Sequence, residues 1–296
     1  MTGKLRTLRR SFGASLLSLL VLLSSAATVV PQGKEKLKPE ELIAKHLDAI
    51  GPQEARSSLK SIIAAGTVEV MIRGGRGVSR LAGSSVLGST NNKNLLNFSF
   101  NDPEYPFERI AFNGDKVTGA FLKPGIRSPL INFLLSYDAI IKQGLLGGTL
   151  SAAWPLRNLT EKNPKLEYAG LKKIEGRQLH ELRYSPRKGG EVKISLFFDA
   201  ETFQHVRTEY RKSIAGQIAG GGIDASKEGS GETRYQMVEE FGDFKKEGAL
   251  MLPHDYKLTL KIDTPGQSMY MEWAAKMVKF AFDQEIPDNE FSIATQ

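Results

Sequence analysis

Residues 107–122, FERIAFNGDKVTGAFL, carry the strongest short-range structural signal in the chain. Two apolar-rich runs, 107–112 and 116–122, flank the short segment Asn113-Gly114-Asp115. A tight hairpin turn needs positive φ angles, and an Asn-Gly pair supplies them at low cost. The stretch therefore predicts an antiparallel β-hairpin.

The sequence on both sides of this hairpin alternates between apolar and polar residues with a period of two. Upstream, Val68 and Val70 alternate with polar neighbours, as do Phe98 and Phe100. Such alternation, interrupted by turn residues, is typical of consecutive antiparallel strands. Further strands are expected at about 166–171, 178–184, 192–198, 205–211, 232–244, 256–262 and 269–273. We predict about nine to eleven strands in all.

Helical patterns occur in two places. Residues 39–50 open with Pro39 and two glutamates, which suit a first helical turn, and a short second helix is expected over 52–60. Residues 129–156 form an apolar helical insertion broken near Gly147-Gly148. Because this insertion is apolar over much of its circumference, it should be buried or cover a cavity.

The predicted fold class is α+β and mainly antiparallel. Long antiparallel meanders avoid exposed edges by curling or closing. We therefore expect a strongly curved sheet or incomplete β-barrel, with helices covering its concave face. Residues 39–296 should form one half-barrel domain of this kind, interrupted by the insertion at 129–156 and by a glycine-rich loop at 214–231.

The first 27 residues have the pattern of an export signal. A basic start is followed by an apolar run from Leu16 to Leu23 and by small residues that fit a cleavage site. The run is shorter than the roughly 20 residues of a spanning helix. We expect a cleaved signal peptide at 1–27, a flexible lead-in at 28–38 and an exported protein; an uncleaved signal anchor is the alternative.

Charge and cysteine content exclude several classes of function. Four of the cationic residues that produce the net charge of +7 lie within the first 27 residues, which contain no acid, so the remainder carries only +3. Nothing is left to favour nucleic acid as a partner. The absence of cysteine excludes disulfides, cysteine-based metal sites, a thiol nucleophile and a lipid-modified cysteine.

Motifs of catalysis and metal binding are missing from the sequence. There is no phosphate-binding loop, HExxH zinc motif, GxSxG nucleophile elbow or EF-hand loop. The four histidines are expected on solvated strands or loops, and acids such as Glu239 and Glu240 are expected to be solvated as well. We therefore expect no catalytic residues, no metal and no cofactor.

Apolar side chains in excess of an ordinary core are the remaining candidates for a binding site. A curved sheet of nine or more strands encloses more space than side chains alone tend to fill. The competing interpretation is that these residues simply fill the core. The candidates for lining a cavity or its lid are Val70, Phe98, Phe100, Phe112, Phe121, Phe133, Leu134, Trp154 and Phe198.

Several short motifs, taken in order, resemble one protein family. They are ELIAKHLDAIG at 41–51, GTVEV at 66–70, FDAET at 198–202, RTEY at 207–210, FGDF at 241–244, LPH at 252–254 and IPDNEF at 286–291. This order is similar to the LolA/LolB-type superfamily of periplasmic lipoprotein-sorting and lipid-carrier proteins, over nearly all of the chain after the signal.

The resemblance implies a half-open antiparallel barrel closed by helices, with an apolar cavity that shields acyl chains between membranes. Without a cysteine to acylate, the chain resembles the soluble carrier and not the lipid-anchored acceptor. The segments 129–156 and 214–231 look larger than a minimal carrier needs, and no single arginine matches the family's lid-latching arginine.

We therefore predict a non-enzymatic periplasmic carrier that binds acyl chains of a lipid or lipoprotein for transfer towards the outer membrane. Its partners would be those acyl chains and, transiently, a membrane or envelope proteins. The alternatives are an envelope structural or interaction module with a filled interior and, further off, a hydrolase without a standard motif.

Overall fold

The computed structural model describes residues 37–74, 77–215 and 231–294. The predicted signal peptide at 1–27, the lead-in except for 37–38, and residues 216–230 of the predicted glycine-rich loop lie outside the described residues. Among the described helices, none combines the length and apolar character that a membrane crossing requires.

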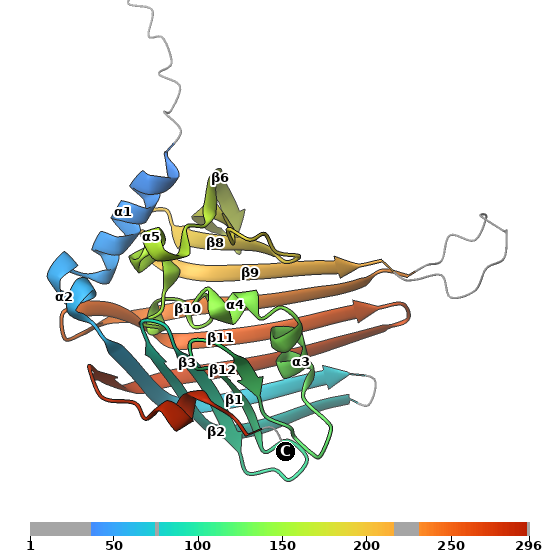
Figure 1. Cartoon of the computed structure of the whole chain (residues 1–296). Helices are drawn as coiled ribbons and strands as arrows, with labels where there is room; N and C mark the ends of the chain where they lie inside the picture. The colour runs from blue at the N-terminus through green and yellow to red at the C-terminus, as the bar shows by residue number, and fades with distance from the viewer. Residues whose placement is uncertain (1–36, 75–76, 216–230, 295–296) are drawn as a thin grey trace, which may run out of the picture. The chain divides into compact units, whose positions relative to one another are not determined.

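Twelve antiparallel strands form a single sheet in the described part of the chain (Figure 1). The predicted mainly antiparallel fold class is confirmed; the strong curvature stays a prediction. The sheet order is β5-β4-β3-β2-β1-β12-β11-β10-β9-β8-β7-β6. The strands are β1 Ser61–Gly74, β2 Gly77–Thr90, β3 Asn94–Phe100, β4 Phe107–Phe112, β5 Val117–Gly119, β6 Lys165–Ile174, β7 Arg177–Ser185, β8 Lys193–Asp199, β9 His205–Ile214, β10 Thr233–Glu247, β11 Leu250–Thr264 and β12 Gln267–Phe282.

The expected count of nine to eleven strands is too low because β2 was not expected. Its sequence, GVSRLAGSSVLGST, is rich in glycine and serine and lacks a clear alternation. It is nevertheless paired along its whole length with β1, from Gly74 opposite Gly77 to Ser61 opposite Thr90. Pairing with a strongly patterned neighbour therefore decides the structure of this segment, as expected where propensity is weak.

The hairpin at 107–122 is present, but its turn differs from the prediction. β4 pairs with a second strand, β5, of only three residues. Gly114 has a positive φ of 98°, whereas Asn113 is absent from the residues with positive φ. Instead, the side-chain carbonyl of Asn113 accepts hydrogen bonds from the backbone N–H groups of Asp115 and Lys116, at 3.0 and 2.8 Å. Asn113 therefore shapes the turn through its side chain.

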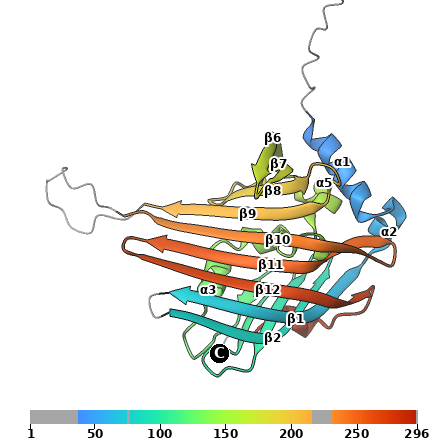
Figure 2. The same cartoon turned by 180° about the vertical axis from the view of Figure 1, so that it is seen from behind.

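Topology explains why the helical insertion crosses one face of the sheet. β5 and β6 follow each other in the chain but form opposite edges of the sheet. The connection between them must span all the intervening strands, and Figure 1 shows it lying over them, whereas Figure 2 shows the strands from behind. Its elements are α3 Pro129–Ser136, α4 Ala139–Lys142, the 3₁₀ turns η1 Gly148–Leu150 and η2 Pro155–Arg157, and α5 Leu159–Lys162.

The two N-terminal helices are α1 Pro39–Ile50 and α2 Gln53–Ser58, close to the predicted ranges. α1 begins with Pro39 in its first turn, and the Glu41 carboxylate accepts a hydrogen bond from the Lys38 backbone N–H at 3.1 Å. Its apolar side is buried through Leu42, Ile43 and Ile50. A last 3₁₀ turn, η3 Asp288–Phe291, buries Phe291 against Leu95 and Ala111 on the opposite face of β3 and β4.

Gly66 marks a β-bulge at which the backbone of β12 lies close to β1. The pairing register shifts between Ala65 and Gly66, and a Cβ at Gly66 would lie 1.8 Å from the Lys276 carbonyl oxygen. We expect Gly66→Ala to lower the free energy of unfolding by about 2–4 kcal/mol, because two backbones would have to separate.

Urea denaturation measures this loss, and Gly74→Ala is the matched control at the end of the same strand. Among the residues that the structure describes, no atom lies within 4 Å of a Cβ at Gly74. Equal stability of the two variants would contradict the close approach at the bulge.

Candidate functional site

One face of the sheet is apolar and is covered by the insertion and by α1. Cross-strand neighbours on this face include Val70 of β1, Trp273 of β12 and Leu258 of β11, which pair in register and are at most 1% exposed. We call it the helix-covered face. It holds the main hydrophobic cluster of the protein.

Eight of the nine predicted lining residues belong to this one cluster. They are Val70, Phe98, Phe100, Phe112, Phe133, Leu134, Trp154 and Phe198, all buried. The ninth, Phe121, is half-buried under the Arg127 guanidinium, whose carbon lies 3.6 Å from the ring centroid. The structure thus brings eight of the candidates together, and their role in binding a ligand stays a prediction.

The insertion fills the space against the sheet. Leu145, Leu146 and Leu150 are at most 6% exposed, and the gap between η1 and strands β2 and β3 amounts to about 10 Å³. A space of this size holds no more than a single water molecule. In this state the helix-covered face is occupied by the protein's own side chains.

A buried carboxylate, Glu108 of β4, holds the beginning of the insertion. It accepts hydrogen bonds from the Ser128 hydroxyl at 2.6 Å and from the Tyr105 hydroxyl, which in turn accepts one from the Trp273 indole N–H at 3.0 Å. Ser128 also caps α3 by accepting from the Ile131 N–H. Burial raises the pKa of Glu108 to about 7, and these hydrogen bonds oppose the rise.

A second buried carboxylate, Glu239 of β10, holds the middle of the insertion. It accepts hydrogen bonds from the Gly147 backbone N–H at 2.7 Å and from the hydroxyls of Tyr210 and Tyr256 at 2.7 and 2.8 Å. Burial raises the pKa of Glu239 to about 7, and all three hydrogen bonds oppose the rise. The expectation that Glu239 is solvated was wrong, because it lies on the helix-covered face.

A histidine pair holds the end of the insertion. The Trp154 indole N–H donates to His46 Nε2 at 3.1 Å, and His46 Nδ1 donates to the Phe203 carbonyl at 3.0 Å. The Trp154 ring stacks on His205 with centroids 4.6 Å apart. Burial lowers the pKa of His46 to about 4 and that of His205 well below its usual value. For these two histidines the expected solvated position was wrong, since both are fully buried.

A sequence pattern marks the two buried carboxylates that hold the insertion. Glu108 occupies the apolar side of the alternation Glu108, Ile110, Phe112, and Glu239 that of Met237, Glu239, Phe241. A carboxylate in place of an apolar residue at such a position indicates a buried acid with dedicated donors. The donors themselves are distant in sequence, so only the fold could identify them.

These titratable groups hold structure together and do not face a cleft. Glu108, Glu239, His46 and His205 are all 0% exposed, and each has hydrogen-bond partners within the protein. His205 Nδ1 is a buried nitrogen without a partner in the described part of the chain. Among the described residues there is also no group of three or more His, Cys, Asp or Glu side chains able to hold a metal ion.

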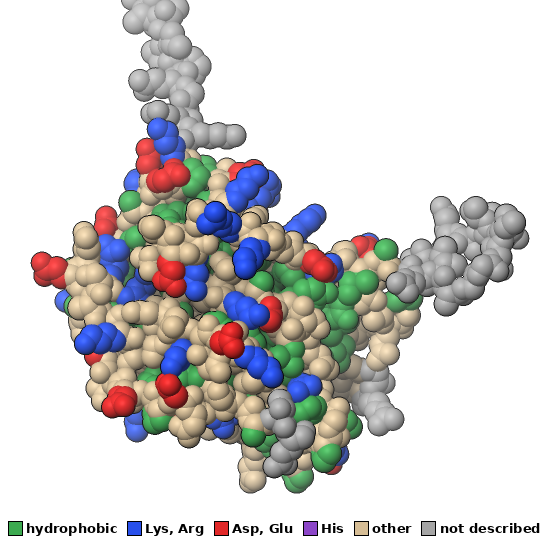
Figure 3. Space-filling view, viewed as in Figure 1, with side chains coloured by type: hydrophobic (Ala, Val, Ile, Leu, Met, Phe, Trp, Pro, Cys, Tyr) green, Lys and Arg blue, Asp and Glu red, His purple; other side chains and the backbone are tan. Residues whose placement is uncertain are grey.

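Apolar side chains continue the core face at the edge of the insertion, towards the strand ends. Met269, Ile262 and Tyr235 are register partners across β12, β11 and β10, on the same face as the core, and all three are half-buried. Tyr235 stacks on Phe133 of α3 with centroids 5.6 Å apart. Figure 3 shows hydrophobic side chains gathered at the surface in the region of α3 and the adjoining strand ends. We call the three register partners the apolar rim.

Comparison with known proteins finds matches among solved structures only. No protein-family model and no curated protein matches the chain. It is similar to the LolA superfamily protein of Nitrosomonas europaea, with 11% identity and a TM-score of 0.41 over 86% of this chain and 97% of that one.

It is also similar to an outer membrane lipoprotein-sorting protein domain of Vibrio parahaemolyticus, with 12% identity and a TM-score of 0.37 over 85% and 94% of the two chains. A DUF1329 family protein of Desulfovibrio piger matches with 10% identity and a TM-score of 0.35 over 87% and 98%. These matches extend over most of the chain, but their identities and TM-scores are low, so the function is argued from the residues of this chain alone.

Proposed function

We propose that the protein is an exported, non-enzymatic envelope protein that binds acyl chains of a lipid or lipoprotein on the helix-covered face. The observation that carries the proposal is the apolar rim. Its side chains continue the core face to the strand ends, where they are partly exposed; on β9 the register partner of Tyr235 is Lys212, whose ammonium lies 5.7 Å from the centroid of the Tyr137 ring. A half-exposed apolar surface continuous with a core is typical of an interaction site.

In this proposal the insertion occupies the place that the acyl chains take. Loading replaces contacts between insertion and sheet with contacts between lipid and sheet. Several hundred Å² of acyl surface removed from water, at about 25 cal/mol per Å², provides on the order of 10 kcal/mol before ordering costs. Release then needs a membrane or a protein partner to receive the chain, and delivery towards the outer membrane is the route we propose.

A tether between insertion and sheet tests this proposal. The Ser151 hydroxyl of the insertion donates to the Asn94 side-chain carbonyl of β3 at 2.8 Å, and the native chain has no cysteine to interfere. In the double variant Asn94→Cys/Ser151→Cys, oxidation joins the two elements. We expect the oxidised protein to lose most of its uptake of a fluorescent hexadecanoic acid analogue and the reduced protein to regain it.

The single variant Ser151→Cys is the control, because it carries the same mutation without a tether. Equal uptake by oxidised and reduced double variant would show that acyl chains do not replace the insertion. The measurement is the fluorescence of the probe during titration, together with mass spectrometry to confirm the disulfide.

A second candidate function is an envelope interaction module with a filled interior. The tight packing of η1 against β2 and β3, with a gap of about 10 Å³, favours it. Organic extracts of gently purified protein distinguish the two. Lipid in the extract supports an acyl-binding function. Extracts without lipid, together with no uptake of any acyl probe, support an interaction module with a filled interior.

A further inference from the structure

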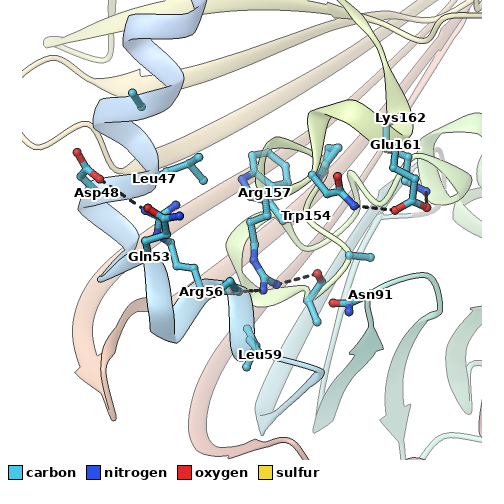
Figure 4. Close-up of a pocket in the computed structure, with 16 residues that line it drawn as sticks. Leu47, Asp48, Gln53, Arg56, Leu59, Asn91, Trp154, Arg157, Glu161 and Lys162 are labelled. Atoms are coloured by element: carbon cyan, nitrogen blue, oxygen red, sulfur yellow. Dashed lines mark hydrogen bonds and ion pairs between the residues drawn. The ribbon is translucent and has the colours of Figure 1, made fainter.

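A groove of about 600 Å³ opens between the N-terminal helices and the end of the insertion (Figure 4). Its walls come from α1 and α2 on one side and from the segment Ala152–Lys162 on the other. Its volume lies within the usual range of ligand-binding sites, roughly 300–1,000 Å³. Glu108, Glu239 and His205 do not line it, but it adjoins the face described above, because Leu59 and Trp154 belong to the main hydrophobic cluster and also line the groove.

Two arginines, Arg56 of α2 and Arg157 of η2, line this groove. Arg157 donates to the carbonyl oxygens of Ala152, at 2.8 Å, and of Arg56, and Arg56 donates through Nε to the Gly51 carbonyl at 2.8 Å. Arg157 has no carboxylate within 4.0 Å among the described residues. Its Nε atom is buried and lacks a hydrogen-bond partner there. Burial, followed by the neighbouring Arg56 charge, lowers the pKa of Arg157.

The charges in the groove are arranged with the cations inside and the anions outside. The side chains of Arg56 and Lys162 are 13% and 16% exposed, whereas those of Asp48 and Glu161 are 82% and 54% exposed. Asp48 is the only carboxylate within 4.0 Å of Arg56 in the described part, at 3.6 Å, and solvent screens so exposed a partner. The lining contains three cations, Arg56, Arg157 and Lys162, against two carboxylates, Asp48 and Glu161, so positive charge is in excess in the inner part of the groove.

The remaining wall is part polar, with Gln53, Ser57, Asn91 and Asn158, and part apolar. Leu47 of α1, Leu59 after α2 and Trp154 of the insertion line the same groove as the two arginines. Guanidinium groups bind planar carboxylates and phosphates through paired N–H donors, and an adjoining apolar wall accepts a hydrocarbon chain.

We propose that this groove binds the anionic head, carboxylate or phosphate, of an amphiphile whose first acyl carbons lie against Leu47, Leu59 and Trp154. The inference rests on the proposed function in one respect, that the ligand carries an acyl chain. Arg56 and Arg157 supply the N–H donors, and the anion relieves the repulsion between the two guanidinium groups. The same anion chemistry occurs in a lipid head and in free phosphate.

Isothermal titration with four probes tests the proposal: dodecyl phosphate, dodecanoate, dodecanol and inorganic phosphate, each below its micelle concentration. We expect dodecyl phosphate to bind about tenfold or more tightly than dodecanol, because hydrogen bonds to a charged group contribute more than neutral ones. Arg56→Gln should remove most of this difference while leaving dodecanol affinity unchanged. Arg56→Lys keeps the charge but loses the paired N–H donors of the guanidinium group. Its preference for dodecyl phosphate over dodecanol should therefore lie between those of the wild type and Arg56→Gln.

Lys162→Gln is a second variant in case Arg56→Gln disturbs α2, and it should weaken dodecyl phosphate selectively. Lys245→Gln is the matched control, because Lys245 pairs with Asp243 at the surface, away from the groove. Equal affinity for dodecyl phosphate and dodecanol would overturn this inference and leave the proposed function standing. Inorganic phosphate that binds as tightly as dodecyl phosphate would also overturn it, since the groove would then hold a free anion. Failure of every acyl probe, dodecanol included, would overturn the proposed function as well.

Discussion

Replacing Trp154 with alanine is expected to lower the free energy of unfolding by about 3–5 kcal/mol, a range typical of a buried indole. The ring is 1% exposed and stacks on His205, and its N–H is the partner of His46 Nε2. Truncation would leave a cavity and also a buried histidine nitrogen without its donor. Both effects act at the end of the insertion, so this end should detach from the sheet first.

Urea denaturation followed by circular dichroism measures the loss. Trp154→Phe is the matched variant, because it keeps most of the ring volume but not the indole N–H. Its cost should be smaller, about 1–3 kcal/mol, the penalty for an unsatisfied buried polar group. A change below about 1 kcal/mol for Trp154→Ala would contradict the packing of the insertion on α1 and β9.

The pH dependence of stability should reveal Glu239 as a buried acid. Burial raises its pKa in the folded protein to about 7 from an ordinary 4.5, so folding favours the protonated form. The stability that Glu239 contributes is therefore fully present below pH 4.5 and is lost as the pH rises to about 7. A shift of this size corresponds to about 3 kcal/mol.

Other titratable groups raise or lower the stability as the pH changes. The quantity to compare is therefore the difference in free energy of unfolding between a variant and the wild type. The pKa of Glu108 is raised in the same way as that of Glu239. His46, whose pKa is lowered to about 4, contributes stability that is present above pH 6.5 and lost as the pH falls to about 4. The groups that directly face Glu239 are Tyr210, Tyr256 and the Gly147 N–H.

The variant Glu239→Gln resembles the protonated acid and can keep the bonds from Tyr256 and Gly147 through its carbonyl oxygen. We expect its free energy of unfolding, relative to the wild type, to rise by about 3 kcal/mol between pH 4.5 and pH 8. Glu285→Gln, at an exposed position, is the control and should give a flat difference. A flat or falling difference for Glu239→Gln would contradict the burial of an acid at this position.

Local sequence patterns were sufficient for most of the sheet. Strands such as β3 and β12 alternate apolar and polar residues, and the pleat then sends one set of side chains to one face. The same reasoning missed β2, whose small residues carry no pattern and whose structure comes from its partner β1. It also assigned Asn113 a positive φ that the turn does not use.

Most of the apolar residues of the candidate site were predicted from the sequence, but the polar contacts that hold the insertion were not. The sequence named eight residues that meet in one core cluster, because large apolar side chains on strand faces are buried together. It gave no indication that Glu108, Glu239 and His46 would fasten the insertion at three points. Each of these contacts joins residues that are 20 to 108 positions apart, and no local pattern records such a pairing.

The sequence by itself determined a mainly antiparallel sheet, an apolar insertion at 129–156 and a chain without cysteine chemistry, because these depend on composition and on short-range periodicity. Only the tertiary structure decided that β5 and β6 form opposite edges, so that the insertion must cross the sheet. It alone placed two carboxylates beneath the insertion and two arginines beside its end. Hydrogen bonds and charges act through distances in space, which the order of residues along the chain does not contain.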